Sequence, residues 1–126
     1  MKQICILCIT LAVIIGLNIF QNTYLDRSGE NLKNITEEII LCIEKENYSM
    51  LNNKINKLEE NWEKDKSIWD VLTEHDDVEE VESSIASLKA YAKIQIKSES
   101  LNECFILKQR IEHILENEKV SLSNIF

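Results

Sequence analysis

The segment from Ile4 to Phe20 constrains this chain more than any other part of it. It reads ICILCITLAVIIGLNIF and contains no charged residue. As a helix rising about 1.5 Å per residue it would span about 25 Å, close to the roughly 30 Å hydrocarbon core of a bilayer. Tyr24 follows at a distance where an aromatic side chain suits the membrane interface. We therefore expect an N-terminal transmembrane helix, with residues 1–24 as the membrane anchor.

Two other interpretations of this segment compete with an uncleaved anchor. A cleaved signal peptide has an apolar region of about 7 to 15 residues that ends at a small-x-small site, whereas Gln21, Asn22 and Thr23 follow here. A buried core helix would need cover on every side, which the rest of the chain hardly supplies. Length and flanks favour an uncleaved signal-anchor, and a secreted helical protein after signal cleavage stays open as an alternative.

The basic residues near the two ends of the segment give its orientation. Lys2 and the terminal amine precede it, while Arg27 and Lys33 follow among several acids. The short stretch before the anchor favours a cytoplasmic N-terminus. We expect a single-pass protein of the cell membrane with an extracytoplasmic C-terminal domain.

The charge of the chain excludes some classes of partner. The net charge is -8, and because Lys2 contributes +1 as the only charged residue before Asp26, the remainder carries -9. Nucleic acid is excluded as a partner because phosphate binding needs clustered Lys and Arg. Adhesion to anionic lipid is disfavoured too, so residues 4–20 must supply the membrane affinity.

The remainder of the chain is patterned as an all-α bundle. The whole chain contains no proline, and its two glycines are Gly16 in the anchor and Gly29 after it, so long helices with short polar links are expected. Apolar residues recur at steps of three and four, and short links make neighbouring helices antiparallel. The prediction is an antiparallel bundle of about four helices over residues 25–119, with residues 120–126 packed on it as a tail; two stacked repeat-like hairpins are the less favoured arrangement. The four helices are expected from after Gly29 to Glu46, from Ser49 to near Leu72, from Asp76 to Lys97, and from Ser100 to about Asn117.

Local signals predict where these helices begin and bend. Gly29 costs about 1 kcal/mol relative to Ala inside a helix, which permits a helix continuous with the anchor and would locate a bend at this position; both arrangements stay open. Asn47 is suited to ending a helix and Ser49 to starting one. Asp76 with Glu79, and Ser100 with Glu103, have the form of capping boxes.

The second helix has the most regular apolar seam, and it contains both tryptophans. Its seam residues follow at steps of three, four and seven, with Asp65 in the seam position between Trp62 and Trp69. Exposed aromatic residues often anchor partners, which would make Trp62, Trp69 and Tyr91 a binding platform. Their positions on apolar seams favour the core instead.

The chain resembles a known family, the bacterial domain of unknown function 4363. The resemblance rests on the N-terminal anchor, on ENWEKDK at 60–66, on TEHDDVEEVESSIASLKAY at 73–91, on LKQRIEHI at 107–114 and on the closing SLSNIF. It implies a small membrane-anchored helical bundle of spore-forming and related bacteria. No activity, cofactor or site comes with the resemblance.

The membrane-proximal end of such a bundle would gather the two histidines and several acids. His75, His113, Asp76 and Asp77 offer imidazole and carboxylate groups of the kind that ligate zinc or another divalent ion. No H-x-x-x-H or H-E-x-x-H spacing is present, and the acids already favour a helix start. We therefore assign no metal site and no cofactor, and retain these four residues as the ligand set of an alternative, a small metal- or ligand-binding domain.

The cysteines do not form a disulfide framework. Cys5 and Cys8 lie about one turn apart in the apolar segment, where they are expected to pack as small apolar groups. Cys42 and Cys104 fall on core positions of the first and fourth helices, toward the same end. A disulfide between them would need Cα atoms within about 7 Å, and buried free thiols are the favoured interpretation.

Catalytic motifs are scarce in this sequence. Because glycine occurs only at positions 16 and 29, the chain contains no G-x-S-x-G, G-x-G-x-x-G or P-loop pattern. A small bundle also rarely offers the concave pocket that an enzyme needs. We predict no catalytic residues and a non-enzymatic interaction or scaffold module for another membrane or envelope protein; the sequence does not define an oligomeric state.

Overall fold

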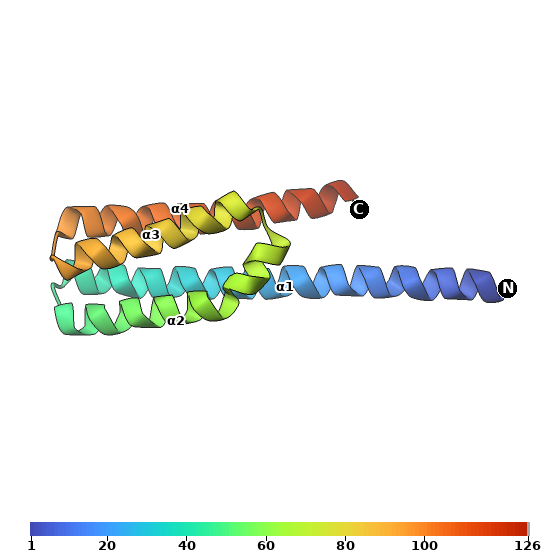
Figure 1. Ribbon diagram of the computed structural model, residues 1–126, viewed down its shortest axis with the longest axis horizontal. Helices are drawn as coiled ribbons and strands as arrows, with labels where there is room; N and C mark the ends of the chain where they lie inside the picture. Colours follow the sequence, from blue (N-terminus) through green and yellow to red (C-terminus); the bar gives the residue numbers. More distant parts are fainter. Residues whose placement is uncertain (126) are drawn as a thin grey trace.

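The computed structural model describes residues 1–125, with the side chains of residues 1–119. Four helices and no strand make up this part of the chain: α1 (Lys2–Glu44), α2 (Tyr48–Leu72), α3 (His75–Lys93) and α4 (Lys97–Ile125). Each helix runs antiparallel to the next (Figure 1). α1 packs extensively against α2 and α4, as α3 does against α4, whereas α2 packs less against α3. The predicted all-α antiparallel fold is confirmed.

The apolar segment and the first bundle helix are one continuous helix, α1. The N-terminal part of α1 extends past the end of α4 and projects alone from the bundle (Figure 1), and its large apolar side chains from Ile4 to Phe20 are exposed, apart from the half-buried Ile15. From Leu25 onward, one face of the same helix is buried. Of the two arrangements left open, the continuous helix is the one observed: α1 runs through Gly29, which lies in a packed helix face where contacts outweigh its low helix propensity.

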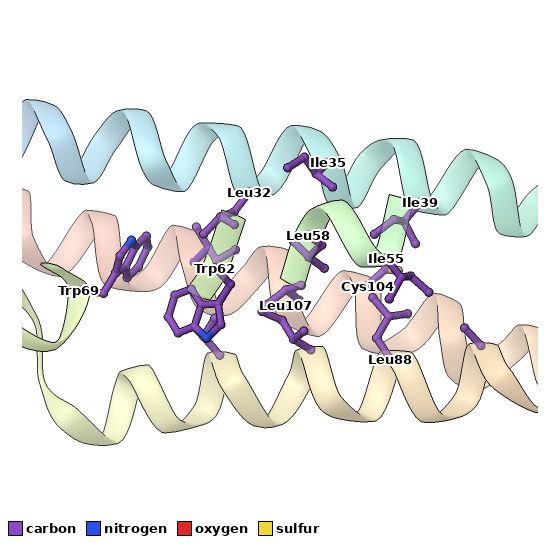
Figure 2. Close-up of a cluster of buried hydrophobic side chains, with 14 of the residues drawn as sticks. Leu32, Ile35, Ile39, Ile55, Leu58, Trp62, Trp69, Leu88, Cys104 and Leu107 are labelled. Carbon is purple, nitrogen blue, oxygen red and sulfur yellow. The ribbon is translucent and has the colours of Figure 1, made fainter. Parts of the chain in front are cut away.

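The core is a single cluster of apolar side chains along the axis of the bundle. It follows the predicted seams, so the steps of three and four place one stripe of each helix inward. Figure 2 shows side chains from the four helices meeting in successive levels. The most deeply buried large residues are Trp62, Trp69, Leu25, Leu32, Ile35, Ile39, Leu51, Leu58, Leu88, Leu107, Ile111 and Val78.

The helix starts differ from the predicted caps. Asn47 begins α2 rather than ending α1, since its side chain accepts a hydrogen bond from the Met50 backbone N–H at 3.3 Å. α3 begins at His75 after Glu74, without a side-chain cap, so the predicted box at Asp76 is wrong. Asp76 instead lies in the first turn, where its charge favours the helix dipole.

The capping box predicted at Ser100 is also wrong. Ser100 lies inside α4, is 2% exposed, and donates from Oγ to the carbonyl oxygen of Ile96 at 2.6 Å. It occupies the seam position one turn before Cys104, so burying this face moves the helix start upstream to Lys97. Tertiary packing here overrides a local capping signal.

Two tight turns are formed by non-glycine residues with positive φ, since the sequence offers no glycine there. Glu46 has φ 55° after α1, and Gln95 has φ 59° after α3. Their left-handed conformation is the one that usually favours glycine after a helix. α3 therefore ends at Lys93, and Lys97, expected at its end, begins α4.

α4 is longer than predicted. It runs past Asn117 to Ile125 (Figure 1). The segment expected as a packed tail continues this helix as far as Ile125, and the packing of its side chains and the placement of Phe126 lie outside the described residues. An ion pair between Lys119 Nζ and Asp26 Oδ1 at 4.0 Å sets this part of α4 beside α1.

Gly29 is required by the close approach of α4 to α1. A Cβ at this position would lie 2.7 Å from Cδ1 and 3.1 Å from Cδ2 of Leu115. Leu115 is itself 6% exposed, so its side chain has little room to move away. Gly29 therefore lowers the helix propensity of α1 but allows α4 to pack closely against it.

We predict that Gly29→Ala lowers the free energy of unfolding by about 1 kcal/mol, because overpacking outweighs a gain of about 1 kcal/mol in propensity. In a Leu115→Ala background the same substitution should be stabilising. Chemical unfolding of the full chain in detergent micelles, followed by circular dichroism, measures both effects.

Gly16→Ala is the matched control, because its added Cβ meets nothing within 4 Å. A Gly29→Ala variant as stable as Gly16→Ala would show that α1 and α4 do not approach as closely as described.

Candidate functional site

The most distinctive polar feature lies where α1 leaves the bundle. Asp65 of α2 is 7% exposed and is the one buried charged residue among the described side chains. Ser28 Oγ donates to Asp65 Oδ2 at 2.6 Å, and the Tyr24 hydroxyl donates to Oδ1 at 2.9 Å. Trp69 Nε1 donates to Ser28 Oγ at 2.9 Å. We call Tyr24, Ser28, Asp65 and Trp69 the junction cluster.

The junction cluster fixes the register of α2 on α1. A buried carboxylate is costly unless hydrogen-bond donors satisfy it, and here two hydroxyl groups from successive turns of α1 do so. Sliding α2 by one turn would leave Asp65 without these donors. A seam-position acid facing Tyr24 and Ser28, four residues apart, is the signal that could have revealed this cluster from the sequence.

The tryptophans belong to the core, as their seam positions predicted. Trp62 and Trp69 are 2% and 0% exposed, and their rings meet edge to face with centroids 5.6 Å apart and planes at 63° (Figure 2). Such a pair contributes to stability beyond its buried area. A platform of exposed tryptophans is therefore wrong, while Tyr91 is half-buried.

The residues proposed as a metal ligand set lie in two places, with His113 and Asp77 together and His75 apart from them. His75 is exposed and pairs with Glu79, Nε2 to Oε1 at 3.0 Å, and with Asp70, Nδ1 to Oδ1 at 3.7 Å. His113 and Asp77 line a shallow pocket of about 390 Å³ that includes neither His75 nor Asp76. Within residues 1–119, no group of three or more His, Cys, Asp or Glu side chains is arranged to hold a metal ion.

Acidic groups at this end repel one another instead. Burial, with the nearby charges of Asp77 and Glu74, raises the pKa of the Glu118 carboxyl above its usual value. Removing a proton from Glu118 is therefore less favourable in the folded chain. Negative charge is therefore concentrated where the start of α3 lies beside the C-terminal part of α4.

The two bundle cysteines are buried free thiols. Cys42 and Cys104 are 6% and 0% exposed, and neither forms a disulfide. Burial, reinforced by the charge of Glu103, raises the pKa of the Cys104 thiol to about 12. A thiol so far from its thiolate form is chemically inert at neutral pH.

An apolar groove lies beside the junction cluster. Its volume is about 420 Å³, and Phe20 and Tyr24 of α1 form one wall. The last turns of α2 form the other, including Val71, which is 80% exposed. We call it the junction groove; it is lined by Phe20, Gln21, Tyr24, Ser67, Ile68, Val71 and Leu72.

The fold and these features define the class of protein: an antiparallel helical bundle whose first helix extends into a long, exposed apolar segment. A family model described as domain of unknown function (DUF4363) matches residues 19–125. The chain belongs to this family, as its resemblance indicated. The match leaves the first 18 residues outside, although the anchor was part of that resemblance. No curated protein and no solved structure matches the chain.

We predict that Ser28→Ala destabilises the bundle by about 3 kcal/mol, because it removes a donor to a buried carboxylate and leaves the Trp69 N–H unpaired. The Ser28→Ala, Asp65→Ala double variant should lose much less than the sum of the single losses. Unfolding by urea in detergent micelles gives the three values.

Ser100→Ala serves as the control, since this buried hydroxyl donates to the backbone carbonyl of Ile96, directly before its own helix, and not to another helix. Its loss should cost well under half as much. Equal losses at both serines would remove the special role of the junction cluster.

Proposed function

We propose that the protein is a non-enzymatic, membrane-tethered helical bundle that presents an interaction surface outside the cytoplasmic membrane. One observation carries the proposal: a single unbroken helix, α1, has an exposed apolar half and a half that forms part of the bundle core. α1 is long and apolar enough to cross a membrane, and none of its most apolar stretch is buried.

Contacts at the junction support retention of the segment over cleavage of a signal sequence. The Tyr24 hydroxyl binds Asp65, and Phe20 lines a groove together with α2. Cleavage after Phe20 would take Phe20 out of the groove and would place a new charged terminus one turn before Tyr24. A signal sequence destined for removal has no need of such contacts.

Basic residues flank the apolar segment on both sides: Lys2 precedes it, and Arg27 and Lys33 follow it among acids. The positive-inside rule counts Lys and Arg and gives acids little weight, so these residues do not set the direction. We propose the orientation with a cytoplasmic N-terminus, which places the bundle outside. Its continuity with the anchor would hold it at a fixed height and angle above the bilayer.

The far end of the bundle, at the α1–α2 and α3–α4 turns, carries exposed apolar side chains suited to a partner protein. Leu41 and Phe105 are 53% and 55% exposed. An ion pair between Lys108 Nζ and Glu37 Oε1 at 3.2 Å aligns α1 with α4, so Leu41 and Phe105, each about one turn further on, lie at the same level. Apolar surface of this kind favours association, and we propose another membrane or envelope protein as the partner.

The experiment uses two double variants, one expected to lose membrane retention and the other expected to lose partner binding. Leu11→Arg with Ile14→Arg places two charges in the apolar segment, at a cost of about 3 kcal/mol each in a bilayer, and should release the chain into the supernatant of an alkaline carbonate wash. Leu41→Arg with Phe105→Arg alters side chains of similar exposure and should leave the chain in the membrane pellet.

Partner binding is measured in the same membranes with a photo-crosslinking residue at Met50, beside Leu41 in a shallow pocket. The wild type should give one adduct of defined mass, the Leu41, Phe105 variant should lose it, and a crosslinker at Glu60 should give none. Release of the wild type by carbonate, or a mature N-terminus beyond Phe20, would contradict the tether. Absence of any adduct would contradict the interaction role.

A further inference from the structure

We propose that the bundle rests on the bilayer through the junction groove, with the apolar end of α2 inserted into the interfacial layer of the outer leaflet. The occupant of the groove would be lipid of the membrane that α1 crosses. The inference rests on the proposed tether and adds a second, peripheral contact with the same bilayer.

The first argument is continuity of the apolar surface. Phe20, 69% exposed, is the last residue of the apolar segment and also lines the junction groove. Ile68, Val71 and Leu72 of α2 lie directly across the groove from it. The exposed apolar surface of α1 therefore passes onto α2 without a charged residue in the groove lining.

The second argument is the depth of this surface. The 17 positions from Ile4 to Phe20 span about 25 Å as a helix, about 5 Å less than the typical hydrocarbon thickness. Lys2 limits how far the other end can extend into lipid. The missing depth corresponds to roughly one turn of α1 beyond Phe20, which is the turn that faces the end of α2.

The third argument is the direction of the polar groups at this level. The Tyr24 hydroxyl points to Asp65 inside the bundle, so its ring contributes an apolar wall to the groove. Arg27 lines a second groove with Phe20 and Tyr24, where a guanidinium group one turn above the apolar surface suits the lipid phosphate layer.

The acids of the α2–α3 link set a limit to the insertion. Glu74, Asp76 and Glu79 are exposed and follow Leu72 within two turns, and Asp70 is exposed in the last turn of α2. Burying these carboxylates in hydrocarbon would be costly, so contact is confined to the side of the last two turns of α2 that faces the groove. A shallow, tilted seat on the interface satisfies both the apolar groove and the acidic link.

The test uses a cysteine-attached, environment-sensitive fluorophore at Val71, with Leu11 and Leu41 as reference positions. Cys5 and Cys8 are replaced by alanine, as is Cys42 because it lines a surface pocket beside Leu41, while Cys104 is fully buried and needs no replacement. The full chain is reconstituted in phosphatidylcholine vesicles that contain lipids spin-labelled either near the headgroup or deep in the acyl chain.

We expect the headgroup-proximal spin label to quench the fluorophore at Val71 several-fold more than the one at Leu41, and the deep label to quench the one at Leu11 most. Strong quenching at Leu11 with equal, weak quenching at Val71 and Leu41 would overturn the inference while leaving the tether in place. Weak quenching at all three positions would overturn the tether and the inference together.

Discussion

The continuity of α1 is the constraint on which the rest of the structure depends. One helix of 43 residues meets two different surroundings: an open apolar surface in its first half and packed partner helices in its second. A helix satisfies its backbone hydrogen bonds internally, so it passes between these surroundings without a linker. Whatever orientation the apolar half adopts is then passed directly to the bundle.

The bundle is assembled around this helix unequally. α2 packs mainly against α1 and less against α3, so its placement depends on the α1–α2 seam. Asp65 contributes specificity to that seam, because a buried carboxylate accepts only an arrangement that supplies donors. The Lys54–Glu38 ion pair, 2.8 Å from Nζ to Oε2, adds a second polar contact toward the far end. With apolar side chains alone, the position of α2 along α1 would be less precisely determined.

The sequence predicted the parts of the fold that periodicity controls. The seams of Leu51 to Trp69 and of Val78 to Ala92 became core, because a stripe at steps of three and four has one face to bury. Capping signals were less reliable, since Ser100 was needed for packing and lay inside α4. Local sequence leaves open whether α1 bends at Gly29, because the role of this glycine depends on Leu115 of a distant helix.

The junction was the part of the site that sequence reasoning missed. His75, His113, Asp76 and Asp77 have the chemistry of metal ligands, yet His75 pairs with Glu79 while His113 and Asp77 line a separate pocket. Asp65 was visible as an acid in an apolar seam, but its donors Tyr24 and Ser28 lie about 40 residues away, at separations of 41 and 37. Only the antiparallel pairing of α1 with α2 joins them.

The most direct measurement of the central claim is the distance between spin labels at Leu11 and Asn34 in the full chain, reconstituted in lipid vesicles. These exposed positions lie on either side of the junction, and a straight helix rising about 1.5 Å per residue separates their backbones by about 35 Å. The continuous α1 predicts one narrow distance distribution near this value. A broad distribution, or a clearly shorter distance, would mean that α1 breaks between lipid and bundle and would contradict the account.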